Sequence, residues 1–329
     1  MAPLKIGIVG VGKLGNYHCR ALASLGGDNL AGVHDIDRLR QAEIANTYRC
    51  PAFDSYDDLL NNVDAVGIAV PTTGHLEVAK RALECGKNVF IEKPITTTVA
   101  EAEELVDYAE RRGLLIQVGH IERFNPAIRC LEQSHLEPMF IESHRLAPFD
   151  PRGTDVAVVL DLMIHDIDII LSLVKSPVKK VDAIGVAVVS DEADIANARI
   201  QFENGCVANV TASRISQHKM RKMRLFQKES YISIDFLQKL TEVFRLTDEQ
   251  EEIPNTVILG QIEKGRHKRR IVYDRPKPGD EDALVAEWRA FIKAVTEKAR
   301  PIVSGRDGLE ALKVATIISE TISGQTVSM

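Results

Sequence analysis

The sequence predicts an α/β protein with a parallel sheet in its N-terminal part and a second, antiparallel or mixed sheet in its C-terminal part. Two observations lead to this prediction. Through the first 120 residues, short β-branched runs alternate with amphipathic helical patterns, which is typical of a parallel sheet covered by helices on both faces. Beyond that point, one long apolar helix is followed by strand patterns in succession, which favours antiparallel pairing. We therefore expect two domains, residues 1–120 and 121–329.

The first domain has five strand patterns separated by four helical ones. The strand patterns are LKIGIVG, NLAGVHD, DAVGIAV, KNVFIEK and LLIQVGH. The helical patterns cover residues 13–25, 37–48, 75–84 and 99–111. Glycines follow several of these helices at the position where a left-handed residue commonly ends a helix, which supports the boundaries.

The second domain opens with a helix at about 155–174, followed by strand patterns over residues 179–236. Asn204-Gly205 between two of them predicts a hairpin turn. Two helices end the chain, near 281–298 and 306–322, and the last could pack back on the first domain. The polar segment 245–280 has no clear pattern, and its EKGRHKRR run is expected to be a solvated hairpin or loop.

Composition narrows the class of partner. The chain has 329 residues, 45% hydrophobic and 27% charged, with a net charge of −6, which is typical of a soluble globular protein. A mildly acidic chain is not expected to bind nucleic acid or an anionic membrane as its main partner. No apolar run reaches the roughly 20 residues that span a bilayer, and the N-terminus does not resemble a signal peptide. Five widely spaced cysteines without a C-x-x-C motif indicate a reduced, cytoplasmic protein with no structural disulfide and no metal site.

A glycine motif at the first strand–helix junction predicts a dinucleotide site. Gly10, Gly12 and Gly15 form G-x-G-x-x-G, which permits a tight turn and close approach of a pyrophosphate to the helix N-terminus. Asp35, at the end of the second strand, is placed to bind the ribose 2′-hydroxyl and repel a 2′-phosphate, which favours NAD over NADP. Arg38 follows closely and could tolerate that phosphate. A glycine-rich turn with a capping Asp, or an S-adenosylmethionine site, is the alternative.

Two further polar groups follow strands of the same sheet. Glu92-Lys93-Pro94 comes at the carboxyl end of a strand, where ligands bind in open α/β sheets, and a half-buried Lys there can act as a proton donor or base. The alternative is a solvated Lys that is paired with Glu and has no catalytic role. His120, Arg123 and Asn125 follow the last strand of this domain.

The apolar helix VVLDLMIHDIDIILSLV carries a polar stripe. Asp161, His165 and Asp168 stand at i, i+4 and i+7 and so share one helical face. Buried charge is costly unless it is paired or used, and Asp161 could orient His165 as a carboxylate does for a catalytic imidazole. By itself, a lone His on such a helix is more often a satisfied core residue.

A basic run, SRISQHKMRKMR, follows a strand of the second domain. The run holds Arg214, His218, Lys219, Arg221, Lys222 and Arg224. In an extended strand alternate residues share a face, so half of these could line one pocket for a diphosphate. A solvated sheet face explains the run equally well.

The ordered motifs resemble the Gfo/Idh/MocA oxidoreductases. The glycine turn, the Glu92-Lys93-Pro94 triplet and the Asp161-x-x-x-His165 pair occur in the family's order, and the resemblance covers nearly the whole chain. It implies a Rossmann domain, then a domain built on a large open, mostly antiparallel sheet. It also implies oxidation or reduction of a sugar or cyclitol hydroxyl with NAD(P), and a homodimer or homotetramer assembled through that sheet.

The resemblance assigns roles to particular residues. It implies that Lys93, Asp161 and His165 are catalytic. The residues expected to bind the cofactor NAD are Gly10, Gly12, Lys13, Leu14, Gly15, Asp35, Arg38, Pro71, Thr72, His75, Glu92, Lys93 and Arg123. Those expected near the substrate are Asn125, Arg152, Thr154, Arg214, Lys219 and Arg221.

The substrate class has three readings at this point. VGHIERFNPAI and the basic run are similar to a branch of the family that acts on nucleotide-linked sugars. An inositol or free-sugar dehydrogenase is the alternative within the enzyme class. A non-catalytic NAD-binding sensor would keep the glycine turn, but the joint presence of Lys93, Asp161 and His165 counts against it.

Overall fold

The computed structural model describes residues 3–150, 156–248, 256–264 and 267–325. The chain divides into two compact units. The first comprises residues 1–124 and 281–313, and the second comprises residues 125–280 and 314–329. Among the described residues, no helix combines the length and apolar character that a bilayer crossing needs.

The first unit contains the predicted parallel sheet. Its strands are paired in the order β2-β1-β3-β4-β5, all parallel. They span Ile6–Val9 (β1), Leu30–His34 (β2), Ala65–Ile68 (β3), Asn88–Glu92 (β4) and Ile116–Gly119 (β5). The helices between them are Lys13–Ser24 (α1), Arg38–Tyr48 (α2), Tyr56–Asn62 (α3), His75–Glu84 (α4) and Val99–Arg111 (α5). Short 3-10 turns cover Thr72–Gly74 (η1) and Ile121–Phe124 (η2). Every residue of β1, β3 and β5 is buried, which explains the continuous apolar runs in the sequence.

The chain returns to this unit near its end. Helix α8 (Ala283–Glu297) buries Trp288 and Phe291 in the cluster that contains Ile6 and Ile8 of β1 and Leu22 of α1. Helix α9 (Gly305–Gln325) begins in the same unit, and its residues from Val314 onward belong to the second. The core of the first unit therefore needs residues from both ends of the sequence.

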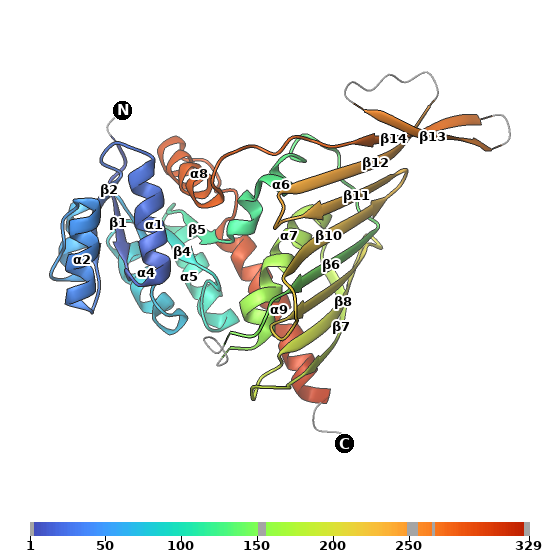
Figure 1. The fold of residues 1–329 in the computed structure, drawn as a ribbon. Coiled ribbons are helices and arrows are strands. Elements are labelled where there is room, and N and C mark those ends of the chain that lie inside the picture. Colours follow the sequence, from blue (N-terminus) through green and yellow to red (C-terminus); the bar gives the residue numbers. More distant parts are fainter. Residues whose placement is uncertain (1–2, 151–155, 249–255, 265–266, 326–329) are drawn as a thin grey trace. The chain divides into compact units, whose positions relative to one another are not determined.

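The second unit is built on a nine-stranded sheet with the order β13-β14-β12-β11-β10-β6-β9-β8-β7. Every neighbouring pair is antiparallel except β6 and β9, which confirms the mostly antiparallel sheet. Its first strands are Phe140–Leu146 (β6), Val178–Val186 (β7), Ile195–Phe202 (β8), Val207–Ser213 (β9) and Met220–Gln227 (β10). The others are Ser230–Asp235 (β11), Leu240–Asp248 (β12), Val257–Lys264 (β13) and His267–Asp274 (β14). Helix α6 (Pro126–Arg129) precedes the sheet, and helix α7 (Ile164–Val174) packs on one of its faces (Figure 1).

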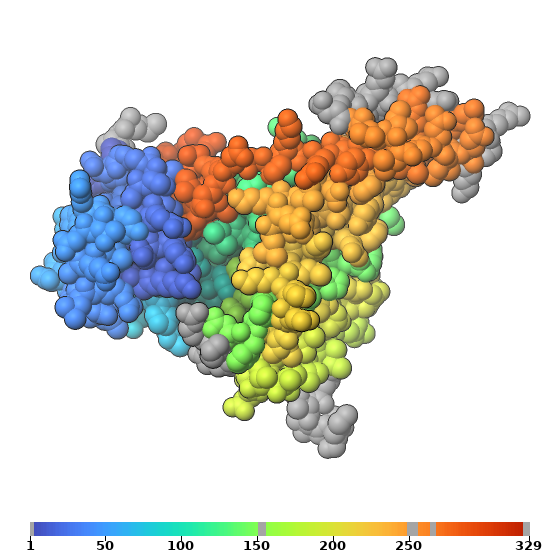
Figure 2. Space-filling model, viewed as in Figure 1, coloured from blue at the N-terminus to red at the C-terminus, as the bar shows by residue number. Residues whose placement is uncertain are grey.

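Much of the polar segment 245–280, which the sequence left unassigned, is strand. β13 and β14 pair as a hairpin through Lys264 and His267, as expected for the basic run, and stand out from the sheet edge (Figures 1 and 2). Val257, Ile258 and Leu259 are each more than half exposed in succession. Because the hairpin has little core to face, its sequence shows no alternation from which a strand could be predicted.

The long apolar helix differs from the expected one at its start. Residues Val159–Met163 (η3) form a π-helix, and regular α-helix begins only at Ile164. The wider π turn falls between Asp161 and His165, so these two residues do not keep the angular spacing of an ideal α-helix. The apolar pattern predicted the helix correctly, but it carries no signal for a local π turn.

Candidate active site

The glycine turn has the backbone that a bound pyrophosphate requires. Gly10 has φ +81°, and a Cβ there would lie 2.8 Å from the Val70 nitrogen. A Cβ on Gly15 would lie 1.9 Å from the Gly10 carbonyl oxygen, so the turn and α1 can approach only with glycine. Gly12 precedes α1 without a side-chain cap, and Lys13 and Leu14 in the first turn are exposed. The first N–H groups of α1 therefore lie at an exposed helix N-terminus, which attracts anions.

Asp35 lies beside that turn. Its Oδ2 accepts a hydrogen bond from the Val11 nitrogen at 2.6 Å, and its Oδ1 accepts from the Asp37 nitrogen at 2.8 Å. Arg38 turns elsewhere, since its guanidinium donates to Gln41 Oε1 at 3.0 Å and to the carbonyls of Phe53 and Asp54. Asp35 therefore lies beside the glycine turn, and the Arg38 guanidinium is hydrogen-bonded within the protein.

Three residues follow the neighbouring strand β3. Pro71 is exposed and Thr72 half-buried at the start of η1. His75 is 1% exposed, and its ring lies between the Pro94 carbonyl (Nδ1, 2.9 Å) and the Val70 carbonyl (Nε2, 3.1 Å). Burial lowers the pKa of His75, against the effect of these carbonyls. His75 therefore ties the η1 turn to the Lys93-Pro94 turn.

Glu92 and Lys93 end strand β4. Glu92 Oε1 accepts from His18 Nε2 at 2.8 Å, and Oε2 accepts from the Lys93 backbone nitrogen at 3.2 Å. Burial alone would raise the pKa of Glu92, but the His18 hydrogen bond and the charge of Lys93 outweigh it and hold that pKa below its usual range. Lys93 itself is half-buried, at the strand end where the sequence predicts a ligand.

The residues after β5 are fixed within the first unit. His120 is 1% exposed, and burial, aided by the positive charges of Lys93 and Arg123, lowers its pKa to about 3. It is therefore neutral at physiological pH. Arg123 donates to the Ile302 carbonyl at 3.1 Å.

The expected catalytic helix places its polar residues unequally. Asp161 and His165 are half-buried, whereas Asp168 is 2% exposed. The adjacent Asp166, which the sequence did not single out, forms a buried ion pair with Arg145 of β6 at 2.6 Å. Only Asp161 and His165 of the predicted stripe retain partial access to solvent, as residues that handle a substrate proton require.

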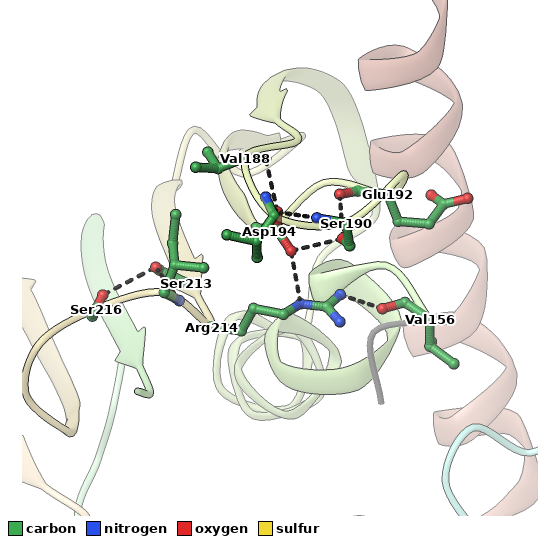
Figure 3. A network of polar contacts seen from close by, with 10 residues as sticks. Val156, Val188, Ser190, Glu192, Asp194, Ser213, Arg214 and Ser216 are labelled. Carbon is green, nitrogen blue, oxygen red and sulfur yellow. Dashed lines mark hydrogen bonds and ion pairs between the residues drawn. The ribbon is translucent and has the colours of Figure 1, made fainter. Parts of the chain in front are cut away.

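The residues expected near the substrate separate into distinct environments. Lys219 and Arg221 are exposed, but Arg214 is 5% exposed and its guanidinium lies against Asp194 (Nε–Oδ1, 3.6 Å) and donates to the Val156 carbonyl (Figure 3). Asn125 caps α6 through the Ala127 nitrogen and donates to the Phe236 carbonyl. Arg152 and Thr154 lie outside the described residues.

Asp194 is the centre of a hydrogen-bond network that the sequence did not predict. Its Oδ2 accepts from the Val188, Val189 and Ser190 nitrogens at 2.7, 2.7 and 3.1 Å, and its Oδ1 accepts from Ser190 Oγ at 2.7 Å (Figure 3). Burial would raise the pKa of Asp194, but these hydrogen bonds hold it well below its usual range. The Arg214 contact with the Val156 carbonyl extends this network to the chain just before η3.

The chain matches two family models. One, described as an oxidoreductase family with an NAD-binding Rossmann fold, matches residues 4–120, and the GFO/IDH/MocA C-terminal domain matches residues 137–232. UDP-N-acetylglucosamine 3-dehydrogenase from Acidithiobacillus ferrooxidans is 43% identical over 317 residues, covering 94% of this chain and 96% of the relative. Myo-inositol 2-dehydrogenase from Thermotoga maritima is 25% identical, covering 94% and 93%.

The solved structures give the same relationship. A structure of the Acidithiobacillus ferrooxidans enzyme has a TM-score of 0.86 and 36% identity, covering 98% of this chain and 99% of that one. Apo scyllo-inositol dehydrogenase from Lactobacillus casei, at 23% identity and TM-score 0.77, covers 98% and 97% and shares the fold. These matches confirm the family, the fold and the cofactor that the sequence predicts. The chain belongs to the Gfo/Idh/MocA family and is an NAD-binding oxidoreductase.

Proposed function

We propose that this protein oxidises the 3-hydroxyl of UDP-N-acetylglucosamine to a ketone, with NAD⁺ as hydride acceptor. The observation that carries the proposal is the 43% identity, over nearly the whole of both chains, to an enzyme named for that reaction. The inositol dehydrogenase covers a similar share of the chain at only 25% identity. The nucleotide-linked sugar is therefore favoured over a free polyol.

The cofactor site supports NAD. The glycine turn with Gly10 and Gly15 leaves room for the pyrophosphate, and Asp35 stands beside it for the adenine ribose. Arg38 is engaged by Gln41 and two backbone carbonyls, which leaves it poorly placed for a 2′-phosphate. When bound, NAD⁺ supplies the acceptor for the hydride on the sugar carbon.

Three side chains divide the proton chemistry. We assign His165 as the base that removes the hydroxyl proton, and Lys93 as the group that polarises the sugar oxygen. Asp161 orients the His165 imidazole and stabilises its protonated form. The partial exposure of Asp161 and His165, within a helix that is otherwise mostly buried, supports this assignment.

The assay follows NADH formation with UDP-N-acetylglucosamine and NAD⁺, coupled to a glutamate-dependent aminotransferase that removes the ketone. Coupling is needed because oxidation of a secondary alcohol by NAD⁺ is usually uphill. His165→Ala and Lys93→Ala are each expected to lower turnover by roughly 10²–10⁴-fold, the usual contribution of general acid–base catalysis. His135→Ala, at a side chain that is 85% exposed, and Lys293→Ala, at one that is 69% exposed, serve as matched controls.

Each possible outcome of the assay tests a different part of the proposal: the substrate, the site residues or the enzyme activity. Turnover of inositol or a free sugar, with none of the nucleotide sugar, would discard the substrate and keep the family. Full turnover in both His165→Ala and Lys93→Ala would discard the site. Binding of NAD without turnover of any sugar or polyol would favour a sensor role.

We also propose a cytoplasmic homodimer or homotetramer that supplies the ketone for the diamino sugar of lipid A. One face of the large sheet supports the assembly. A row of aromatic rings, tilted against one another, crosses five strands of that face with centroid separations of 5.0 to 5.6 Å: Phe140, Phe226, Tyr231, Phe244 and Tyr273. A second copy of this face would cover such a row. Light scattering of the purified protein tests the assembly, and a monomer would contradict it.

A further inference from the structure

A buried chain of hydrogen bonds links the last part of the sequence to the strand end that carries Lys93. The indole Nε1 of Trp288 lies 3.0 Å from His18 Nδ1, and His18 Nε2 lies 2.8 Å from Glu92 Oε1. Trp288 is 0% exposed and His18 is 3% exposed. The second Glu92 oxygen accepts from the Lys93 backbone nitrogen. Helices α8 and α1 and strand β4 thus meet in one polar path inside an apolar core.

The direction of each hydrogen bond follows from the chemistry of the groups. An indole N–H can only donate, so His18 Nδ1 must accept and carries no proton. In a neutral imidazole the proton then resides on Nε2, which donates to Glu92. Trp288 and the Glu92 carboxylate therefore both require the one neutral tautomer of His18 in which Nε2 carries the proton.

The path is held rigidly by packing. The Trp288 ring stacks on Phe90 with centroids 4.4 Å apart, and the His18 ring meets both rings edge-on, at 5.6 Å from Trp288 and 5.2 Å from Phe90. A Cβ on Gly67 would lie 2.7 Å from the Trp288 ring. A Cβ on Gly119 would lie 3.0 Å from the Glu92 carboxylate. Gly67 on β3 and Gly119 on β5 therefore leave just enough space for the Trp288 ring and the Glu92 carboxylate.

We propose that Trp288 and His18 are positioning residues, which hold the Glu92 carboxylate in place and through it fix Lys93 for catalysis. The proposal rests on the proposed role of Lys93. The ionisable groups that act on Glu92 are His18 from α1, Lys93 from its own strand end, His75 from α4 and His120 after β5. The His18 side chain is hydrogen-bonded to the carboxylate at 2.8 Å. Trp288 and His18 need not contact the substrate or the cofactor.

The tautomer is tested first, without any assay of activity. Nitrogen chemical shifts of ¹⁵N-labelled histidine report which ring nitrogen carries the proton, and His18→Gln identifies the His18 signals by their loss. The wild type is expected to show the Nε2–H form of His18, with an unprotonated Nδ1 whose shift is displaced by the hydrogen bond from Trp288. Trp288→Phe keeps the aromatic ring but removes the donor, so the Nδ1 signal should move towards that of a ring nitrogen without this hydrogen bond. An unchanged Nδ1 signal in Trp288→Phe would refute the role of Trp288.

Kinetics then test positioning. Trp288→Phe and His18→Leu are expected to lower kcat about tenfold with little change in the KM for NAD⁺, since slight misplacement of a catalytic group costs up to about 100-fold. The acid limb of the kcat–pH profile should move to higher pH, because Glu92 then loses the donor that lowers its pKa. His18→Gln, whose amide can accept from the indole and donate to Glu92, should restore most of the turnover.

A matched control separates positioning from packing. Phe291→Leu alters the same core beside Trp288, at a ring separation of 5.6 Å, but leaves the hydrogen bonds intact. It should lower the free energy of unfolding without moving kcat or the pH profile. Equal effects in Phe291→Leu and Trp288→Phe would overturn the proposal. If the wild type oxidises no sugar, the proposed function fails, whereas the nitrogen chemical shifts still decide whether Trp288 donates to His18.

Discussion

Two carboxylates, one in each unit, are kept ionised by different kinds of donor: Asp194 is fully buried, and Glu92 is largely buried. Asp194 is held by three backbone nitrogens, the Ser190 hydroxyl and Arg214. Glu92 is held by the His18 imidazole and a single backbone nitrogen. Both have a pKa below the usual range, although burial opposes ionisation in each.

The donors decide what each carboxylate can do. The backbone amides and the guanidinium around Asp194 keep the same protonation state throughout the physiological pH range, so the charge around Asp194 is constant. The imidazole beside Glu92 is itself hydrogen-bonded to a further side chain, the Trp288 indole. A carboxylate of the first kind anchors a loop, whereas one of the second kind can be tuned by a neighbour. The second kind is the one that lies beside Lys93.

The largest expected effect comes from removing the backbone-held carboxylate. Asp194→Ala leaves the N–H groups of the 188–190 turn without their acceptor and Arg214 without its anion. We expect a loss of about 3–5 kcal/mol in the free energy of unfolding, measured by urea titration. Asp182→Ala, which breaks an exposed ion pair with Lys180, should cost no more than about 1 kcal/mol. Equal losses in the two variants would contradict the anchoring role of Asp194.

Glu92→Gln should cost less, about 1–2 kcal/mol at neutral pH, because the amide keeps the shape and one oxygen acceptor. The pKa of Glu92 is lower in the folded than in the unfolded chain, where it is near 4.5. Its ionisation therefore stabilises the fold fully above that value, and this contribution is lost as the pH falls through the folded pKa. Urea titrations at several pH values should show the wild-type advantage shrinking below about pH 4.5, and an advantage that grows there would refute the sign.

A smaller effect tests the space around Glu92. In Gly119→Ala the new methyl would lie 3.0 Å from the carboxylate, so Glu92 must shift by a few tenths of an ångström. We expect a loss of about 1 kcal/mol in thermal or urea unfolding. Gly260→Ala, on the exposed strand β13 with no atom within 4 Å, is the control and should be nearly neutral. If Gly119→Ala were as mild as the control, the carboxylate would be less confined than the structure indicates.

The smallest effect sets the baseline for both carboxylates. Lys293 and Glu297 form an exposed pair one helical turn apart, at 4.0 Å. Lys293→Met should change the free energy of unfolding by no more than about 0.5 kcal/mol. A loss comparable to that of Glu92→Gln would mean that burial contributes little to the difference between these pairs.

The fold could be predicted where the burial of a strand or helix produces a recognisable pattern of apolar residues in the sequence. The five parallel strands are buried on both faces and so read as continuous apolar runs, as Ile6–Val9 does. The β13–β14 hairpin could not be predicted, because Val257, Ile258 and Leu259 are exposed in succession. Likewise, nothing in the apolar pattern distinguishes the π turn at Val159–Met163 from a regular helix.

The site could be predicted where residue type and place along the chain coincide. Lys93 follows a buried strand, and His165 interrupts an apolar helix, so both stand out in the sequence. His18 and Trp288 are 270 positions apart, and each lies in a helix where a core residue is expected. Asp194 was missed for a related reason, since the nitrogens that hold it belong to a turn that no motif marks. Long-range partners of this kind become visible only once the chain is folded.

The return of helix α8 to the first unit has a consequence for biosynthesis. Ile8, Leu22 and Phe90 leave the ribosome early, but their packing partners Trp288 and Phe291 are translated almost two hundred residues after Phe90. The nascent chain must therefore carry an uncovered apolar surface while the whole nine-stranded sheet is being synthesised. The first unit begins to be translated first, but its core is completed last. Its apolar surface is therefore open to aggregation or to chaperone binding during translation.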